Sequence, residues 1–266
     1  MPEEEPQPQP TDAVLGGTDA QPQPYDAVLG GNTKSIRLKE AVRRIDQAAK
    51  EKLTELHLSG IGLEEVAPEI SKCTQLETLV LWKRDDERGF VGNRFTEFPD
   101  AVLQLINLKR LLLWESQITS IPEALGQLSN LTVLSLPNNQ ITSIPEALGQ
   151  LSNLRVLILN NNKITSIPEA LGQLSNLAVL SLSNNQITSI PEALGQLSNL
   201  TALSLPNNQI TSIPEALGQL SNLRRLYLSN NQITSIPKAI RDMENLKTLD
   251  LQGNPISIPP EILQDG

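Results

Sequence analysis

The chain has 266 residues, 30 of them acidic and 21 Lys or Arg, so its formal net charge is -9 at pH 7. This balance argues against a nucleic-acid groove, which needs a basic stripe to neutralise phosphates, although a local basic patch stays open. Only 3% of the residues are aromatic, which suits a core of stacked aliphatic layers. Cys73 is the one cysteine, so no intramolecular disulfide is possible.

The first residues, MPEEEPQPQP, are acidic and proline-rich and do not have the basic and apolar segments of a signal peptide. No apolar run approaches the ~20 residues that span a bilayer. We therefore expect a cytoplasmic protein without membrane insertion.

Residues 1–32 are of low complexity. QPQPTDAVLGG and QPQPYDAVLGG begin at Gln7 and Gln21, and such Gln-Pro and Gly-Gly segments cannot bury a core. This composition predicts a disordered tail. The alternative is a docking peptide around Tyr25 and Val28–Leu29.

Residues 33–52 carry small apolar residues at helical spacing. The pattern predicts an amphipathic helix from about Ile36 to Lys52, with Thr33 or Ser35 as N-cap. We interpret it as a cap on the domain that follows, although its basic residues could also meet an acidic partner.

The domain at residues 53–266 is built from one repeated unit. The stretch ITSIPEALGQLSNL starts at five positions 23 residues apart: Ile118, Ile141, Ile164, Ile187 and Ile210. The full unit reads LxxLxLxxNxIxxIPxxLxxLxxL, which is identified as a leucine-rich repeat. Nine units begin at Leu53, Leu76, Leu108, Leu131, Leu154, Leu177, Leu200, Leu223 and Leu246. The second unit is nine residues longer, and the excess predicts an insertion at residues 82–92.

The repeat pattern predicts an α/β fold. Positions 3 to 7 of each unit should form a strand with the leucines at positions 4 and 6 pointing inward. Nine stacked units then give a leucine-rich repeat solenoid, or horseshoe, with a parallel concave sheet of about nine strands. Short helical or 3₁₀ turns should follow each proline on the convex side.

An asparagine that recurs at position 9 of most repeats should have a structural role. At position 9 its side-chain amide can bond backbone groups of adjacent turns that would otherwise be buried and unsatisfied. The residues are Asn139, Asn162, Asn185, Asn208, Asn231 and Asn254. The first and third units have Ile61 and Ser116 instead, so they must satisfy their backbones differently.

The sequence shows no catalytic or metal-binding motif. It lacks a P-loop, a nucleophile elbow and a GxGxxG motif. Cys73 takes the place of a core leucine, and residues 85–87 are carboxylates that alternate with basic residues in a solvated loop. His57 stands alone at an outward position, so it is only a candidate contact for a partner. We expect no enzyme activity, cofactor or metal.

Variation among the four full units that run from Leu131 to Asn222 is confined to positions 2, 3, 5, 7 and 10. Most of these positions lie on the strand, where a binding scaffold would vary. We include Arg155 and Ile158 as candidate contacts on this face. The alternative is that recent duplication has left a few tolerated surface changes.

The two tryptophans, Trp82 and Trp114, both stand at position 7 of adjacent units. Val80 and Leu112 at position 5 and Phe90 in the insertion should lie beside them. Clustered exposed aromatic residues are typical of an interface anchor. In the alternative, the insertion folds back and buries both rings.

A second cluster lies in the last two units. Arg225 and Tyr227, with Arg224, Lys247 and Asp250 nearby, could bind an acidic surface or form a solvated rim. The final unit ends without an obvious polar cap over its apolar residues Ile256, Ile258, Ile262 and Leu263. Self-association through this C-terminal repeat is therefore a further expectation.

From about Ser35 to Leu263, the 23-residue pattern resembles two families. They are the Ras-suppressor-like intracellular scaffolds and the repeat region of cyanobacterial Roco proteins, whose GTPase domain has no counterpart here. The likeness to the second includes the helix, LTELHLSGIGLEEVAPEI, the insertion and the final GNPISIPPEIL. The resemblance implies a scaffold that binds a protein partner on its concave face. The alternatives are a regulatory repeat subunit of a split Roco-type GTPase system and an enzyme with an unrecognised site.

Overall fold

The computed structural model describes residues 33–85 and 89–257. The predictions for the tail, including Tyr25, and for Ile258, Ile262 and Leu263 lie outside the described residues.

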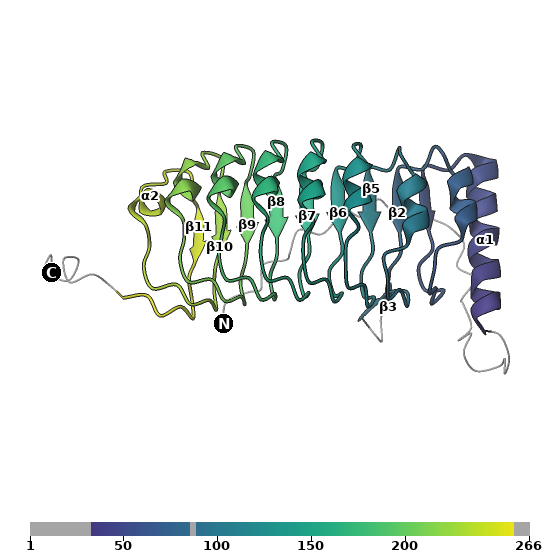
Figure 1. Cartoon of the computed structure of the whole chain (residues 1–266), viewed down its shortest axis with the longest axis horizontal. Helices are drawn as coiled ribbons and strands as arrows, with labels where there is room; N and C mark the ends of the chain where they lie inside the picture. The colour runs from purple at the N-terminus through teal and green to yellow at the C-terminus, as the bar shows by residue number, and fades with distance from the viewer. Residues whose placement is uncertain (1–32, 86–88, 258–266) are drawn as a thin grey trace, which may run out of the picture. The chain divides into compact units, whose positions relative to one another are not determined.

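Nine strands, one from each repeat, form a single parallel sheet in chain order, with a separate two-stranded hairpin between the second and third (Figure 1). This confirms the predicted solenoid sheet. The strands of the sheet are β1 Glu55–His57, β2 Thr78–Val80, β5 Arg110–Leu112, β6 Val133–Ser135, β7 Val156–Ile158, β8 Val179–Ser181, β9 Ala202–Ser204, β10 Arg225–Tyr227 and β11 Thr248–Asp250. The register is fixed so that each position pairs with the same position of the next repeat, as Leu134 does with Leu157.

Each regular strand spans positions 3 to 5, which is shorter than the predicted positions 3 to 7. Beyond it the backbone still bonds to the next repeat: the Leu136 N–H donates to the Ile158 carbonyl at 2.9 Å. At position 8 the chain adopts the left-handed conformation, with φ of 55° at Asn161. Asparagine tolerates this conformation better than most residues. The ladder therefore continues while the strand geometry ends.

A helical turn follows each of the first eight strands of the sheet, and these turns form a second layer beside the sheet (Figure 1). The predicted 3₁₀ turns are confirmed, each of the central ones beginning directly after a proline. They are η1 Pro68–Lys72, η2 Asp100–Gln104, η3 Glu123–Gln127, η4 Glu146–Gln150, η5 Glu169–Gln173, η6 Glu192–Gln196 and η7 Glu215–Gln219, and the eighth is the short α-helix α2 Lys238–Arg241.

The glycine of the EALGQ turn is required by packing. A Cβ atom added to Gly149 would lie 2.5 Å from the carbonyl oxygen of Ala170 in the next turn, well inside van der Waals contact. Its counterparts in η3, η5 and η6 meet the next alanine in the same way. The constancy of this stretch is thus explained by close stacking of identical turns.

The position-9 asparagines have the structural role that the sequence predicts. Asn162 accepts a hydrogen bond from the Ile141 N–H at 2.9 Å, and its Nδ2 donates to the carbonyls of Leu136 and Leu159 at 3.1 and 3.0 Å. Asn162 is 8% exposed, so these bonds satisfy groups that water does not reach. In the third repeat, Ser116 donates to the Asn93 carbonyl at 3.2 Å instead.

The first repeat is covered by helix α1, Thr33–Glu51, at the purple end of the chain in Figure 1. Ala41, Ile45 and Ala48 are fully buried against the core. The helix already includes Thr33, so Ser35 lies inside its first turn and is not the N-cap. The helix thereby closes one end of the aliphatic core.

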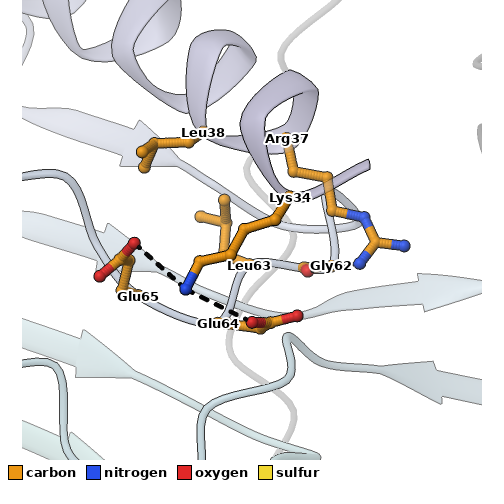
Figure 2. A pocket seen from close by; sticks show the side chains of 7 residues that line it. All are labelled: Lys34, Arg37, Leu38, Gly62, Leu63, Glu64 and Glu65. Atoms are coloured by element: carbon orange, nitrogen blue, oxygen red, sulfur yellow. Dashed lines mark hydrogen bonds and ion pairs between the residues drawn. The ribbon is translucent and has the colours of Figure 1, made fainter. Parts of the chain in front are cut away.

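A small crevice lies at the seam between α1 and the first repeat (Figure 2). Lys34 lies 3.6 Å from both Glu64 and Glu65, and Arg37 donates to the Gly62 carbonyl at 3.4 Å. The crevice has a volume of about 10 Å³, which holds one water molecule at most. These contacts attach the cap, and the crevice is too small for a ligand.

Cys73 is a core residue, as predicted from its place in the repeat. It is fully buried, with Sγ 3.5 Å from the carbonyl oxygen of Ile45 in α1. Burial raises the pKa of the thiol, which keeps it in the unreactive protonated form.

Candidate functional site

We define the outer sheet face as the side chains at positions 3, 5 and 7 of the repeats, which the sequence predicts to be concave. Its central part is chemically plain. Asn160 accepts hydrogen bonds from the Ser181 hydroxyl and the Ser183 N–H at 2.8 and 2.9 Å, so its polar groups bond one another. Ile158 is half-buried among them, and Arg155, just before β7, is exposed.

The two tryptophans form the most distinctive feature of this face. The rings of Trp82 and Trp114 are stacked, with centroids 4.0 Å apart and planes 3° from parallel. They meet because β2 and β5 are neighbours in the sheet, in spite of the insertion between them. Trp114 Nε1 donates to the Ser135 hydroxyl on β6 at 2.8 Å, which fixes the pair across three repeats.

Both tryptophans are half-buried, so neither sequence interpretation applies in full. The rings are packed, but each retains a solvent-accessible part. A parallel stack of this kind adds about 1 kcal/mol to the burial of the rings. The stack is therefore a rigid, preorganised aromatic surface.

The insertion is a β-hairpin and not an irregular loop. Strand β3, Lys83–Asp85, pairs antiparallel with β4, Gly89–Val91, just past β2. Phe90 belongs to β4, and its side chain lies outside the described part of the chain. The exposure of this candidate contact therefore stays a prediction.

Gly92 joins the hairpin to the third repeat, and the sequence analysis did not single it out. A Cβ atom on Gly92 would overlap the carbonyl groups of Trp114 and Glu115. Only glycine allows this approach, so the hairpin's return strand leads directly onto the backbone that carries Trp114. The sequence did contain a sign of this role: Gly92 stands at position 8, which most other repeats fill with asparagine.

Val80 and Leu112, predicted as outward neighbours of the tryptophans, are buried at 7% and 8% exposure. Directly paired across β2 and β5, they leave little surface for a partner. Ser135, at the same position of the next repeat, is 1% exposed, so position 5 is covered along this part of the sheet whatever the size of its side chain.

Arg110 is a member of this site that the sequence analysis missed. It lies at position 3 of β5, between Thr78 and Val133 in the register, and it is half-buried. Its Nε atom is buried, and within residues 33–85 and 89–257 no hydrogen-bond partner reaches it. A buried Nε cannot itself meet a partner from solvent, so only the terminal Nη atoms of this half-buried side chain can contact an anionic group.

His57 lies at the edge of the outer sheet face, on β1. Its Nε2 is 2.7 Å from Glu55 Oε1, and both side chains are more than half exposed. No group of three or more His, Cys, Asp or Glu that could hold a metal ion occurs among the described residues. His57 thus shows only a surface contact with a neighbouring carboxylate.

Arg225 and Tyr227 lie on β10, beside Thr248 and Asp250 of β11. Arg225 is exposed and Tyr227 is half-buried, as expected for side chains on the sheet face. In the final repeat Leu249, whose equivalents in the other repeats are buried, is 37% exposed. Ile256 is half-buried, and no described repeat packs beyond it.

The helices of the described segments include none that combines the length and the apolar character needed to cross a membrane.

Comparisons with known proteins agree with this geometry. A model described as "Leucine rich repeat" matches residues 198–256, and one described as "Leucine-rich repeat region" matches residues 99–206 and 146–226. A comparison with curated proteins found no match.

Solved structures with the same repeat architecture include three that inform function. One is the ectodomain of the Arabidopsis thaliana membrane receptor kinase GASSHO1/SCHENGEN3 in complex with CASPARIAN STRIP INTEGRITY FACTOR 2, at 34% identity and a TM-score of 0.65 over 74% of this chain and 24% of that one. A leucine-rich repeat protein of Leptospira interrogans is 35% identical, with a TM-score of 0.61 over 76% and 55%.

The third is the Arabidopsis receptor kinase HAESA in complex with the peptide hormone IDA and the co-receptor SERK1. It is 30% identical, with a TM-score of 0.63 over 76% of this chain and 34% of that one. This chain therefore spans between about a quarter and about half of the length of these proteins.

Proposed function

Because this chain is a leucine-rich repeat protein, we propose that it is a non-enzymatic interaction module that binds a protein partner on its outer sheet face. Leucine-rich repeat domains generally mediate protein interaction and ligand binding. We place the site at the Trp82/Trp114 stack and the protein in the cytoplasm.

The observation that carries the proposal is the stack itself. Two half-buried tryptophans, held parallel and anchored by the hydrogen bond from Trp114 to Ser135, offer a partner a large apolar surface that is already ordered. Binding to it would cost little side-chain entropy, and tryptophan is among the residues most enriched at interface hot spots. Two of the similar structures were solved with a bound peptide hormone or integrity factor, which supports binding as the general role.

The test is a pull-down of partners with the immobilised full chain and with a Trp82→Ala/Trp114→Ala variant. We expect the variant to lose partners that the unchanged protein retains. Ile106→Ala is the matched control, because Ile106 is an apolar side chain that is 67% exposed in the connection between η2 and β5, outside the sheet. Equal recovery by the tryptophan variant, with its circular dichroism spectrum unchanged, would rule the site out.

A second candidate is the regulatory repeat subunit of a split Roco-type GTPase system. It is supported by the likeness of the capping helix, of the insertion past the second strand and of the last repeat to Roco repeat regions. Adding the purified chain to a GTPase encoded by an adjacent gene should change its rate of GTP hydrolysis. An unchanged rate, or the absence of such a gene, would remove this candidate.

A further inference from the structure

The outer sheet face, together with the position-2 residues that border it, is opposite in charge to the chain. In the repeats from Leu108 to Asn245, positions 2, 3, 5 and 7 contain no acidic residue. The basic residues at these positions are Lys109, Arg110, Arg155, Arg224 and Arg225. Five acidic residues of these repeats lie on the other layer, where η3 to η7 each begin with a glutamate. Glu115 lies at position 8, where it accepts a hydrogen bond from Asn138. A chain of net charge -9 thus carries a basic strip along its sheet.

Three arginines of this strip form no ion pair within the part of the chain that the structure describes. Lys109 forms an ion pair with Glu77 at 2.7 Å. Among the described residues, by contrast, Arg110, Arg155 and Arg225 form no ion pair, and Arg155 and Arg225 are exposed. An arginine with five N–H donors and no internal partner is suited to bind a carboxylate in two-point fashion.

The strand order sets the spacing of these cations. Arg110 lies on β5, and Arg155 immediately precedes β7, two strands further along the sheet. Arg225 lies on β10, three strands beyond β7. At ~4.8 Å per strand these steps are about 10 Å and about 14 Å. An extended chain rises ~3.3 Å per residue and alternates its side chains between two faces. Carboxylates four residues apart lie on one face and are about 13 Å apart, so with the length of the arginine side chains they match both steps.

Acidic residues border the strip at both ends. Glu55 stands on β1, and Asp250 stands on β11 beside Tyr227. A long polyanion such as a nucleic acid would extend beyond the cations and meet these carboxylates, whereas a segment of about eight residues would fit between them. The border therefore favours a short acidic peptide segment.

We propose, resting on the function proposed above, that the partner contributes an extended acidic segment that lies across the strands between the tryptophan stack and Tyr227. Its carboxylates contact Arg110, Arg155 and Arg225, and its neighbouring residues pack on Trp114. Surface ion pairs in water are weak one by one, so recognition depends on the three acting together with the aromatic surface.

The experiment titrates the full chain with an eleven-residue peptide that has glutamates at positions 2, 6 and 10, all on one face of an extended chain, and alanine, proline and serine elsewhere. Trp82 and Trp114 are the only tryptophans, so their fluorescence reports binding directly. We expect saturable binding that weakens as salt is added. Arg110→Gln, Arg155→Gln and Arg225→Gln together should weaken binding about tenfold, the combined effect of three surface pairs. Arg241→Gln, the same change on α2, should leave it unchanged.

A charge exchange tests the register. Arg155→Glu should abolish binding of the peptide, and a lysine in place of its middle glutamate should restore it. Equal binding of a peptide with glutamine at all three positions, or no effect of the triple variant, would overturn the inference. So would equally tight binding of a short single-stranded DNA. If only the tryptophan variant loses a cellular partner, the proposed function stands and the acidic segment does not.

Discussion

The central repeats and the second and third repeats use the same framework in different ways. Between Leu131 and Asn222 every turn is identical, the glycines touch the next alanine, and the sheet face carries small side chains. In the second and third repeats the turns diverge, a hairpin enters, and two tryptophans stack. The regular central repeats thus show only close stacking, whereas the irregular second and third repeats carry a surface with a distinct shape.

The difference shows that the framework tolerates a large insertion at one place. The hairpin leaves the repeat just after β2 and returns at Gly92, so that Asn93 still donates to the carbonyls of Leu58 and Leu81. The hydrogen-bond ladder is preserved while the outer surface changes. Four measurements would break or sharpen this contrast.

The largest effect on stability should come from the buried hydrogen bonds that the position-9 asparagines make to adjacent repeats. Asn185→Ala removes the acceptor of the buried Ile164 N–H and the donor to the carbonyls of Leu159 and Leu182. Leaving these groups unsatisfied should lower the free energy of unfolding by about 3 kcal/mol. Urea denaturation followed by circular dichroism measures it.

The matched control is Asn176→Ala. This exposed asparagine makes one bond, to the Ser152 carbonyl at 2.8 Å, so its loss should cost about 1 kcal/mol or less. Equal destabilisation by the two variants would contradict the role assigned to the buried ladder.

The next effect should separate the two regions. Gly92→Ala forces a methyl group against the backbone of Trp114 and Glu115, and Gly172→Ala forces one against Ala193. Each should cost about 2 kcal/mol through overpacking. Only Gly92→Ala should also shift the tryptophan emission of the folded protein. An emission spectrum unchanged by Gly92→Ala would show that the hairpin does not hold the stack.

A smaller effect is expected from the stack. Beyond the loss of the ring's apolar burial, Trp114→Ala loses the ring contact and the bond to Ser135, together about 1.5 kcal/mol. Ile106→Ala should change stability by less than about 0.5 kcal/mol, because the side chain is mostly in solvent. Thermal unfolding of both variants gives the comparison, and equal melting temperatures would show that the stack is not stabilising.

The smallest effect concerns the cap. Hydrogen bonds from Arg43 and Arg44 lower the pKa of Glu40 to about 2 from its ordinary value of 4.5. A lowered carboxyl pKa stabilises the fold above pH 4.5, and this contribution disappears as the pH falls toward 2. Because the pair lies at the surface, it should amount to less than about 1 kcal/mol.

Unfolding of the Glu40→Gln variant should accordingly depend less on pH between 4.5 and 2 than that of the unchanged chain. Replacing Arg43 and Arg44 together by glutamine should reproduce this loss. A variant with the same acid profile as the original protein would show that the ion pairs contribute nothing.

Most of the fold could be predicted because it is encoded locally and repeatedly. The 23-residue period places Leu134 and Leu157 in equivalent buried positions. The same period places Asn162 at position 9, where its side chain bonds the backbone of adjacent repeats. The candidate site could be predicted only in part. Equal positions in adjacent repeats brought Trp82 and Trp114 together, but nothing in the period indicated that Val80 and Leu112 would be buried.

The pattern of apolar and asparagine positions alone determines the solenoid, because each repeat can satisfy its core and backbone only against a neighbour. What the tertiary structure decided lies between repeats. It set the parallel orientation of the two indoles, the close approach of Gly92 to the backbone of Trp114 and the burial of the Arg110 Nε atom. These depend on side chains more than twenty residues apart that meet only after stacking, and a local pattern contains no record of such contacts.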